Sequence, residues 1–191
     1  MGRLNDISLA TQVAVFGNKR AFDQLVREYQ SPVRRFFLTQ SAGNEALSDD
    51  LAQDTFIKAY THISQYRGTS SFLTWLTRIA YNVWYDYCRS EKLKVKSEKT
   101  PSEVTAGSVE GMSAASSSLF TLHSSLDLDL HAALAILKDE ERTCITLQLI
   151  DGYAIDEIAG ITSMPANTVK SHLKRGKEKL ATYLRQNGYD R

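Results

Sequence analysis

The stretch from Ser48 to Glu91 reads SDDLAQDTFIKAYTHISQYRGTSSFLTWLTRIAYNVWYDYCRSE and decides the fold. It contains two apolar stripes with helical spacing, separated by a short loop at residues 66–71. The first stripe consists of Leu51, Thr55, Phe56, Ala59 and Tyr60, and the second of Phe72, Trp75, Leu76, Ile79, Ala80 and Val83. In the loop, Gly68 permits a tight bend and the serines can cap the next helix. The stretch therefore predicts two helices joined by a capped turn.

The polar faces of these two helices differ in character. The first leaves an acidic face in water, formed by Asp50, Gln53, Asp54 and Lys58. The second is aromatic and basic outside its stripe, with Arg78, Asn82, Tyr85, Asp86 and Arg89 on its other faces. This contrast suggests two macromolecular partners, a protein on one face and nucleic acid on the other.

The preceding residues continue the helical pattern. Residues 6–17 predict a helix with Leu9, Val13 and Phe16 on one side and Gly17 as its stop. Asn18 caps a second helix, which we expect to end before Ser31-Pro32, where the proline would begin another. No segment alternates with period two, so the predicted fold class is all-α.

A change in composition marks a linker after the first domain. From Ser90 onward, serine, glycine, threonine and charged residues replace the periodic apolar residues, and we expect a first domain at 1–91 and a flexible linker at 92–127. Residues 100–137 contain no Lys or Arg, but they do contain four carboxylates, Glu103, Glu110, Asp127 and Asp129. This linker is either a passive tether or an acidic segment that mimics nucleic acid.

The predicted second domain, residues 128–191, has the pattern of a helix-turn-helix. Its helices precede a turn expected from Gly160 to Pro165, and the last helix begins near Thr168. Residues 131–167 carry a net charge of −4 and residues 168–191 a net charge of +5. A basic last helix on an acidic support suits insertion into a DNA groove, although cations near a helix C-terminus also complement its dipole.

Composition limits the other classes of function. Net charge is only +1, so nucleic-acid binding has to come from local patches. Cys88 and Cys144 have no paired spacing, which indicates free thiols, and no apolar run is long enough for a membrane span. The four histidines lack metal-ligand spacing and no Gly-rich phosphate loop occurs, so we expect no enzyme, no cofactor and no metal site. Without a hydrophobic signal core, the expected location is the cytoplasm.

Three motifs resemble one family. DLAQDTFIKAY, YRGTSSFLTWLTRIAYN and GYAIDEIAGITSMPANTVKSHLKRGKEKL are similar to the extracytoplasmic-function (ECF) sigma factors, the small promoter-recognition subunits of bacterial RNA polymerase. The resemblance implies two small helical domains, core polymerase and promoter DNA as partners, and an anti-sigma factor as regulator. It further implies a monomer outside the polymerase complex.

The resemblance also assigns roles to residues. The face with Asp50, Gln53, Asp54 and Lys58 would bind the coiled coil of the largest polymerase subunit, although these carboxylates also complement a helix dipole. The loop would capture a base flipped from the minus-ten element, unless it is only a capped turn that packs on the domain. The implied minus-ten residues are Tyr66, Arg67, Gly68, Thr69, Ser70, Ser71, Arg78 and Asn82. The implied minus-thirty-five residues are Asn167, Thr168, Lys170, Ser171, Lys174 and Arg175.

Two aromatic groups on the second helix are expected to differ in role. Trp75 belongs to the apolar stripe and is predicted to be core, whereas Tyr81 and Tyr85 are candidates for strand separation.

Gly176 stands where the family has alanine, and a helical glycine costs about 1 kcal/mol. The alternative to a sigma factor is a helix-turn-helix regulator with an N-terminal dimerisation or sensor domain.

Overall fold

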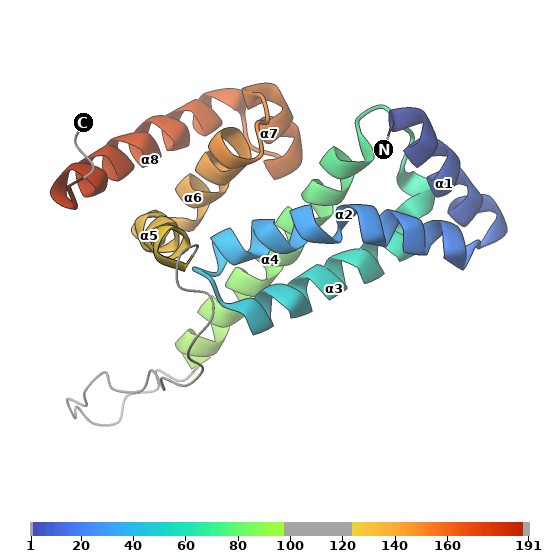
Figure 1. The fold of residues 1–191 in the computed structure, drawn as a ribbon, viewed down its shortest axis with the longest axis horizontal. Helices are drawn as coiled ribbons and strands as arrows, with labels where there is room; N and C mark the ends of the chain where they lie inside the picture. Colours follow the sequence, from blue (N-terminus) through green and yellow to red (C-terminus); the bar gives the residue numbers. More distant parts are fainter. Residues whose placement is uncertain (1, 98–123, 189–191) are drawn as a thin grey trace.

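The computed structural model describes residues 2–97 and 124–188, and no strand occurs in these two segments, which confirms the all-α class (Figure 1).

The first two helices are bounded by the predicted caps. Helix α1 (Arg3–Phe16) ends at Gly17, whose φ of 61° is left-handed. The Asn18 side chain then caps α2 (Lys19–Gln40) by accepting hydrogen bonds from the backbone N–H groups of Arg20 and Ala21. Phe16 was grouped with Leu9 and Val13 on one side of this helix, but it is 78% exposed because the helix ends there and the chain turns away at Gly17.

The predicted break at Pro32 is wrong. Helix α2 continues through this proline to Gln40, and its buried stripe runs from Ala21 through Leu25 and Val33 to Phe37. A proline inside a helix removes one backbone hydrogen bond and costs about 3 kcal/mol. Tertiary burial of the uninterrupted stripe outweighs this cost, since Leu25 and Phe37 are completely buried.

Helices α3 (Glu45–His62) and α4 (Phe72–Ser97) carry the two stripes of the deciding stretch. A short turn, η1 (Ile63–Gln65), follows α3. The first unit, α1 to α4, is closed by Leu51, Thr55 and Ala59 of α3 packing near Phe72, Leu76, Ala80 and Val83 of α4, all of them buried. Phe56, Trp75 and Ile79, also predicted in the stripes, are half-buried at the edge of this core, and Tyr60 is 38% exposed.

The helices extend further toward the linker than expected. Helix α4 reaches Ser97, and α5 (Ser124–Ala135) begins before residue 128. Residues 90–97 contain no glycine or proline and are rich in the strong helix formers lysine, leucine and glutamate, so the loss of apolar periodicity alone does not end the helix. The acidic positions Glu103 and Glu110 lie outside the described residues.

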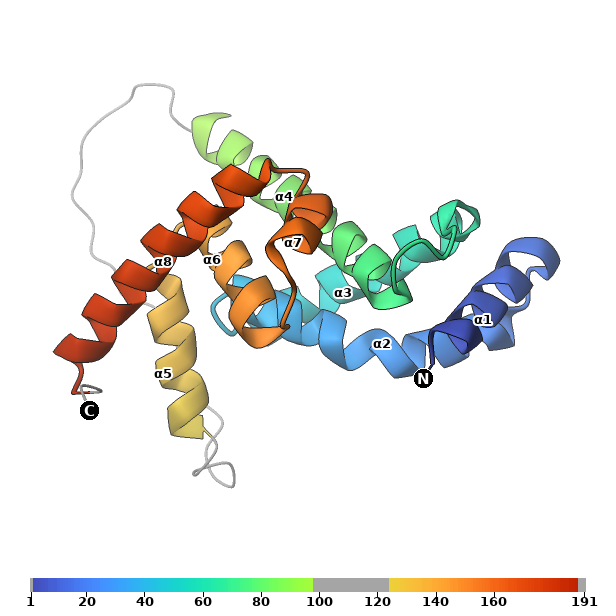
Figure 2. The same cartoon turned by 90° about the horizontal axis from the view of Figure 1, so that it is seen from above.

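The second unit, α5 to α8, contains the predicted helix-turn-helix. Helix α6 (Asp139–Ile145) leads through a π-helical turn, η2 (Thr146–Ile150), to α7 (Ile155–Thr162) and the long α8 (Ala166–Gln186). The turn is shorter than predicted, because Gly160 remains inside α7 and Ser163, with φ of 57°, makes the left-handed step instead. In Figure 2, α7 lies beside α4, so the second unit rests directly on the first.

Gly176 allows α8 to approach α6 closely. A Cβ atom at position 176 would lie 2.8 Å from Cγ1 of Ile145, which is buried at 2% exposure. Ile145 cannot move away cheaply, because Cγ1 is near the backbone and the side chain is enclosed. The glycine therefore has a packing role, and its conformational cost is offset by the short distance between the two helices.

We predict that Gly176→Ala destabilises the chain by about 1–3 kcal/mol, as overpacking does, despite the better helix propensity of alanine. Gly160→Ala is the matched control: this glycine is also helical, but a Cβ there would have no neighbour within 4 Å. The control should be neutral or up to about 1 kcal/mol more stable. Urea unfolding of both variants measures the difference, and equal stabilisation of the two would contradict the packing role.

Candidate nucleic-acid interface

A broad groove opens where the 66–71 loop and the start of α4 face α7. Its volume is about 1210 Å³. Of the eight residues predicted for the minus-ten site, seven line this groove: Tyr66, Arg67, Thr69, Ser70, Ser71, Arg78 and Asn82. Lys58, Gln65 and Trp75 also line it, while Gly68 does not. The fold therefore brings together residues that the sequence places on a loop and two turns of a helix.

The loop is held by the caps and the bend that its residues predict. Gly68 has a φ of 69°, and a Cβ atom there would lie 3.0 Å from Cδ1 of Ile7, so the loop also passes close to α1. The Ser71 hydroxyl accepts a hydrogen bond from the backbone N–H of Thr74 at 3.0 Å. These contacts fix the position of the loop relative to α4.

Aromatic rings form the wall behind the loop. The centroid of the Tyr66 ring lies 5.3 Å from that of Phe72, in an edge-to-face arrangement, and 5.5 Å from that of Trp75. The Tyr66 hydroxyl donates a hydrogen bond to the carbonyl of Ser70 at 3.1 Å. Phe72 is buried at 1% exposure, whereas Tyr66 and Trp75 are half-buried. The prediction that Trp75 belongs only to the core is therefore incomplete, because the same indole lines the groove.

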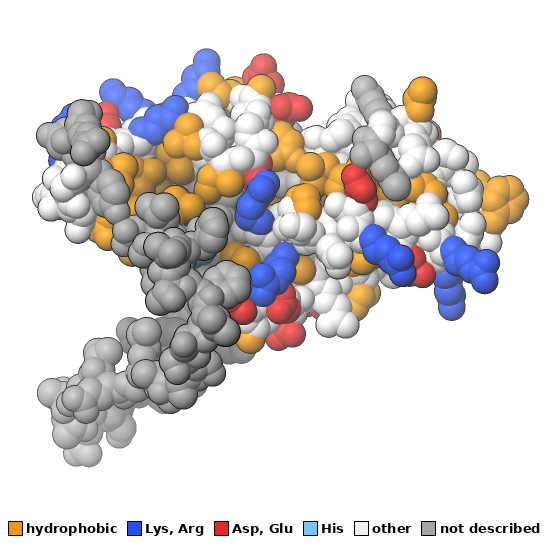
Figure 3. All heavy atoms as spheres, in the orientation of Figure 1, with side chains coloured by type: hydrophobic (Ala, Val, Ile, Leu, Met, Phe, Trp, Pro, Cys, Tyr) orange, Lys and Arg blue, Asp and Glu red, His pale blue; other side chains and the backbone are white. Residues whose placement is uncertain are grey.

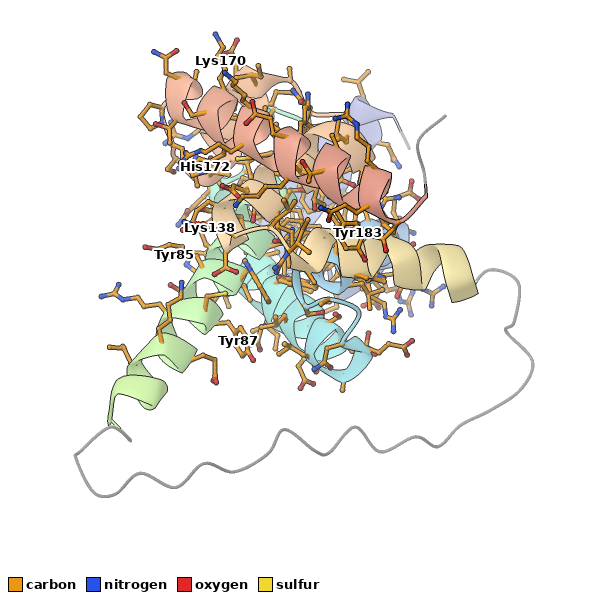
Figure 4. All side chains as sticks on the ribbon, turned by 90° about the vertical axis from the view of Figure 1, so that its left-hand side faces the viewer. Tyr85, Tyr87, Lys138, Lys170, His172 and Tyr183 are labelled. Atoms are coloured by element: carbon orange, nitrogen blue, oxygen red, sulfur yellow. The ribbon has the colours of Figure 1, made fainter. Side chains whose placement is uncertain are left out.

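Tyr81 and Tyr85, the two tyrosines of α4 that were predicted to separate DNA strands, differ in their exposure. Tyr85 is 54% exposed, as a strand-separating residue has to be, but Tyr81 is only 8% exposed. Tyr81 faces the second unit, where burial raises its pKa to about 12. The expectation that Tyr81 contacts DNA therefore conflicts with its burial. Figure 4 shows that the side chains of Tyr85 and Tyr87 project from different sides of α4.

The acidic face of α3 is exposed as predicted. Asp50, Gln53 and Asp54 point to solvent, and Lys58 pairs with Asp86 of α4 at 3.4 Å. Sequence reasoning missed Ile57, which is 56% exposed among these polar residues. The signal available was its position, because Ile57 falls outside the apolar stripe of its helix.

The basic residues of α8 face outward. Asn167, Lys170, Ser171, Lys174 and Arg175 are exposed and Thr168 is half-buried. Figure 3 shows Lys and Arg atoms over α8 and acidic atoms over α7, and Figure 4 shows Lys170 on the outer side of its helix. The Arg175 Nε group donates to the carbonyl of Ser171 at 3.2 Å, which keeps this guanidinium along the helix.

One cation of α8 has a structural role instead. Lys179 donates to Glu141 of α6 at 2.6 Å, and the Glu141 side chain is 3% exposed. Burial opposes ionisation of Glu141, but the hydrogen bonds from Lys179 and from the Lys138 backbone N–H outweigh it and lower the pKa. This pair therefore anchors α8 to its support.

Residues 2–97 and 124–188 contain neither a metal-binding cluster nor a membrane-spanning helix. In these segments no cluster of His, Cys, Asp and Glu residues is arranged to hold a metal ion. Nor does any helix of the described chain have the length and apolarity to cross a membrane. Cys88 and Cys144 are both free, half-buried and buried respectively, as predicted.

Comparison with known proteins gives consistent matches. Residues 25–93 match the family model of sigma-70 region 2, and residues 127–180 match that of sigma-70 region 4. The chain is 31% identical to the RNA polymerase sigma-H factor of Pseudomonas aeruginosa over 85% of either chain. It is 31% identical to the ECF RNA polymerase sigma-E factor of Haemophilus influenzae over 92% of this chain and 93% of that protein.

Two solved structures have a similar fold. The sigma factor RpoE in complex with the anti-sigma factor NepR, from Bartonella quintana, matches with a TM-score of 0.66 and 26% identity, over 86% of this chain and 96% of that one. CnrH in complex with the cytosolic domain of CnrY matches with a TM-score of 0.65 and 25% identity, over 96% of this chain and 99% of that one.

Regions 2 and 4, in this order on two helical units, define a sigma-70-type promoter-recognition subunit. The chain belongs to the ECF sigma factors of bacterial RNA polymerase. Its function is to bind core polymerase, to recognise promoter DNA and to promote strand opening. A match to region 2 over residues 25–93 accounts for the N-terminal unit, so the alternative of a regulator with a sensor or dimerisation domain is set aside.

We predict that Glu141→Gln lowers the unfolding free energy by about 1–2 kcal/mol at neutral pH, because a charged hydrogen bond at a half-exposed lysine is lost. The folded-state pKa of Glu141 is depressed, so its stabilisation is present above the ordinary glutamate pKa of about 4.3 and is lost as the pH falls through the folded pKa. Denaturant unfolding of both proteins at several pH values should show the two curves converging in acid. A constant difference down to the acid limit would contradict this.

Proposed function

We propose that residues 1–91 bind core polymerase and recognise the minus-ten element, and that residues 128–191 recognise the minus-thirty-five element. The convergence of Tyr66, Arg67, Thr69, Ser70, Ser71, Arg78 and Asn82 on one groove carries this proposal. During promoter opening, the groove holds an unstacked base of the opened DNA strand. The linker between the two units is assigned to residues 92–127, of which 92–97 and 124–127 continue the flanking helices.

The chemistry of the groove suits single-stranded DNA. Unstacking a base costs a few kcal/mol, and stacking on an aromatic ring returns about 1–3 kcal/mol per base. Tyr66 and Trp75 offer that surface, and Asn82 offers an amide for a base edge. Arg67 and Arg78 are exposed beside it, where they neutralise the strand's phosphates.

The acidic face of α3 serves as the polymerase docking surface. Asp50, Gln53 and Asp54 contribute charge and hydrogen-bonding groups, and exposed Ile57 adds an apolar contact among them. A charged rim around a small apolar centre is the usual composition of a protein interface. Lys58 lies where this face meets the groove, since it belongs to the α3 face and also lines the groove.

Helix α8 reads the upstream element in the major groove. Its exposed residues Asn167, Lys170, Ser171 and Lys174 follow a spacing of three and four, so they share one face of the helix. Thr168 and Arg175 lie beside that face. Lysine and arginine there bind phosphate or guanine edges, while asparagine and serine add hydrogen bonds to bases.

Partners and location follow from the family. Two similar structures are complexes with an anti-sigma factor or with the cytosolic domain of CnrY, and we assign a comparable protein regulator to this chain. The chain acts in the cytoplasm without a cofactor, is monomeric outside the polymerase and is not an enzyme. The direct test is transcription from promoter DNA by core polymerase with and without the purified chain.

Replacing Asp50 and Asp54 together by lysine should weaken core polymerase binding at least ten-fold, because charges at a docking face are reversed. The same charge change at exposed Asp23 and Asp156, outside this face, is the control and should bind normally. Competition with the unmodified chain for core polymerase measures both, and unfolding curves verify that both variants are folded. A double mutant that competes as well as the unmodified chain would remove the docking assignment.

Tyr66→Ala should leave core binding intact and reduce promoter melting, because the wall of the groove loses its stacking ring. Tyr66→Phe keeps the ring and loses the hydroxyl that donates to Ser70, so it should melt DNA nearly normally. Permanganate reactivity of unpaired thymines in the polymerase complex reports melting. Full reactivity with Tyr66→Ala would show that the groove does not hold the strand through this residue.

A further inference from the structure

Helix α1 supports the aromatic wall of the groove from behind. Asp6, in the first turn of this helix, is 3% exposed, and Tyr29 of α2 is 9% exposed. The Tyr29 hydroxyl donates a hydrogen bond to the Asp6 carboxylate at 2.8 Å. Burial and this hydrogen bond raise the pKa of Tyr29 well above its usual range, so the hydroxyl keeps its proton and remains the donor. The bond therefore joins α1 to α2 through two side chains that solvent hardly reaches.

Stability alone does not account for a carboxylate at this place. The Oδ2 atom of Asp6 accepts the bond from Tyr29, while Oδ1 is enclosed without a hydrogen-bond partner among the described residues. An enclosed carboxylate is costly unless hydrogen bonds satisfy both oxygens, and an apolar pair of similar shape would avoid that cost. A directed hydrogen bond supplies what apolar packing lacks, because it fixes the direction and the depth of the Tyr29 ring in the core.

The Tyr29 ring stands at the inner end of a row of rings that leads to the groove. Its centroid lies 5.3 Å from that of Phe72, and the Phe72 centroid lies 5.3 Å from that of Tyr66 and 5.4 Å from that of Trp75. Tyr66 and Trp75 line the groove. A close-packed interior has little free volume to absorb a shift, so a displaced Tyr29 ring displaces the rings in front of it. The position of the wall therefore depends on Asp6.

The residue after Asp6 holds the loop. The backbone at Gly68 comes so close to Ile7 that a Cβ atom there would lie 3.0 Å from Cδ1 of Ile7. The beginning of α1 lies beside η1 and the loop that follows it (Figure 1). Adjacent residues of one helical turn thus support both the ring wall and the loop of the same groove.

We propose that Asp6 and Tyr29 are positioning residues for promoter opening: their hydrogen bond, together with the contact between Ile7 and the loop, holds the aromatic wall and the loop at the spacing that an unstacked base requires. The role in opening rests on the proposed function of the groove. The positioning itself rests on the contacts of Asp6, Tyr29 and Phe72 and is tested separately in the free chain.

Two kinds of substitution separate the hydrogen bond from the stability of the fold. Asp6→Leu together with Tyr29→Phe replaces the pair by apolar groups of similar shape, so the bond is lost without leaving an unpaired polar atom and the chain should stay folded. Core polymerase should bind this double variant normally, but permanganate reactivity of the opened strand should fall about three- to ten-fold, because the wall is no longer held in place. Tyr29→Phe alone removes the same bond and should show the same loss. Asp6→Asn keeps an acceptor for the Tyr29 hydroxyl and should open the promoter to within about two-fold of the unmodified chain.

Val13→Ala is the matched control for stability. Val13 lies on the same helix, two turns beyond Asp6, and is 4% exposed. Its truncation removes buried contacts but leaves the bond between Asp6 and Tyr29 intact, so opening should remain normal wherever the chain is folded. If Val13→Ala or Asp6→Asn reduces opening as much as the double variant does, stability or charge controls opening and the positioning role is wrong.

Trp75 provides a readout that needs no polymerase. The chain has two tryptophans, so in a Trp84→Phe background the fluorescence of Trp75 alone reports on the wall. Acrylamide should quench it about 1.5- to 2-fold more strongly in the double variant, since this half-buried ring becomes more accessible when the wall shifts, and equally in Asp6→Asn, Val13→Ala and the starting protein. Unchanged quenching in the double variant would overturn the positioning. Stronger quenching with undiminished promoter opening would instead contradict the proposed function of the groove, because the wall would have moved without effect on the strand.

Discussion

The packing of Phe72 is the interaction on which both the first unit and its groove depend. This ring, at the first position of α4, is 1% exposed, and its centroid lies 5.3 Å from that of the Tyr29 ring of α2. It also lies 5.3 Å from Tyr66 and 5.4 Å from Trp75. One buried ring therefore joins the core of the helical unit to the aromatic wall of the groove. Since the wall is supported from behind by the core, the groove can present rings to a ligand without collapsing on itself.

Much of this arrangement could be predicted from the sequence because it is local. The spacing of three and four identified the buried faces of α3 and α4, and Asn18, Gly68 and Ser71 signalled caps and a bend that the chain does adopt. What failed depended on distant packing. Helix α2 passes through Pro32 because burial on both sides outweighs one lost hydrogen bond, and no window around the proline contains that information.

Contacts between the two units were beyond sequence reasoning for a related reason. Gln40 reads as an ordinary polar helix end, yet it is among the most enclosed side chains of the described residues. Tyr81 looks like the other aromatic residues of α4, but it is buried because the second unit covers it. The burial of both residues depends on side chains that lie more than sixty positions away along the chain. The hydrogen bonds between Gln40 and the hydroxyls of Thr143 and Thr146 are an example. Periodicity carries no signal of that kind.

The distribution of charge explains how a chain of net charge +1 can bind DNA selectively. Helices α6 and α7 begin with acidic residues, among them Glu141 and Glu157, which complement the positive ends of their helix dipoles. The same carboxylates repel phosphate wherever they are exposed, whereas the outer face of α8 and the arginines beside the groove attract it. Each unit alone therefore has a small attractive surface and a weak electrostatic drive toward DNA. If the two units bind the two promoter elements as proposed, stable recognition then requires both surfaces to act at once.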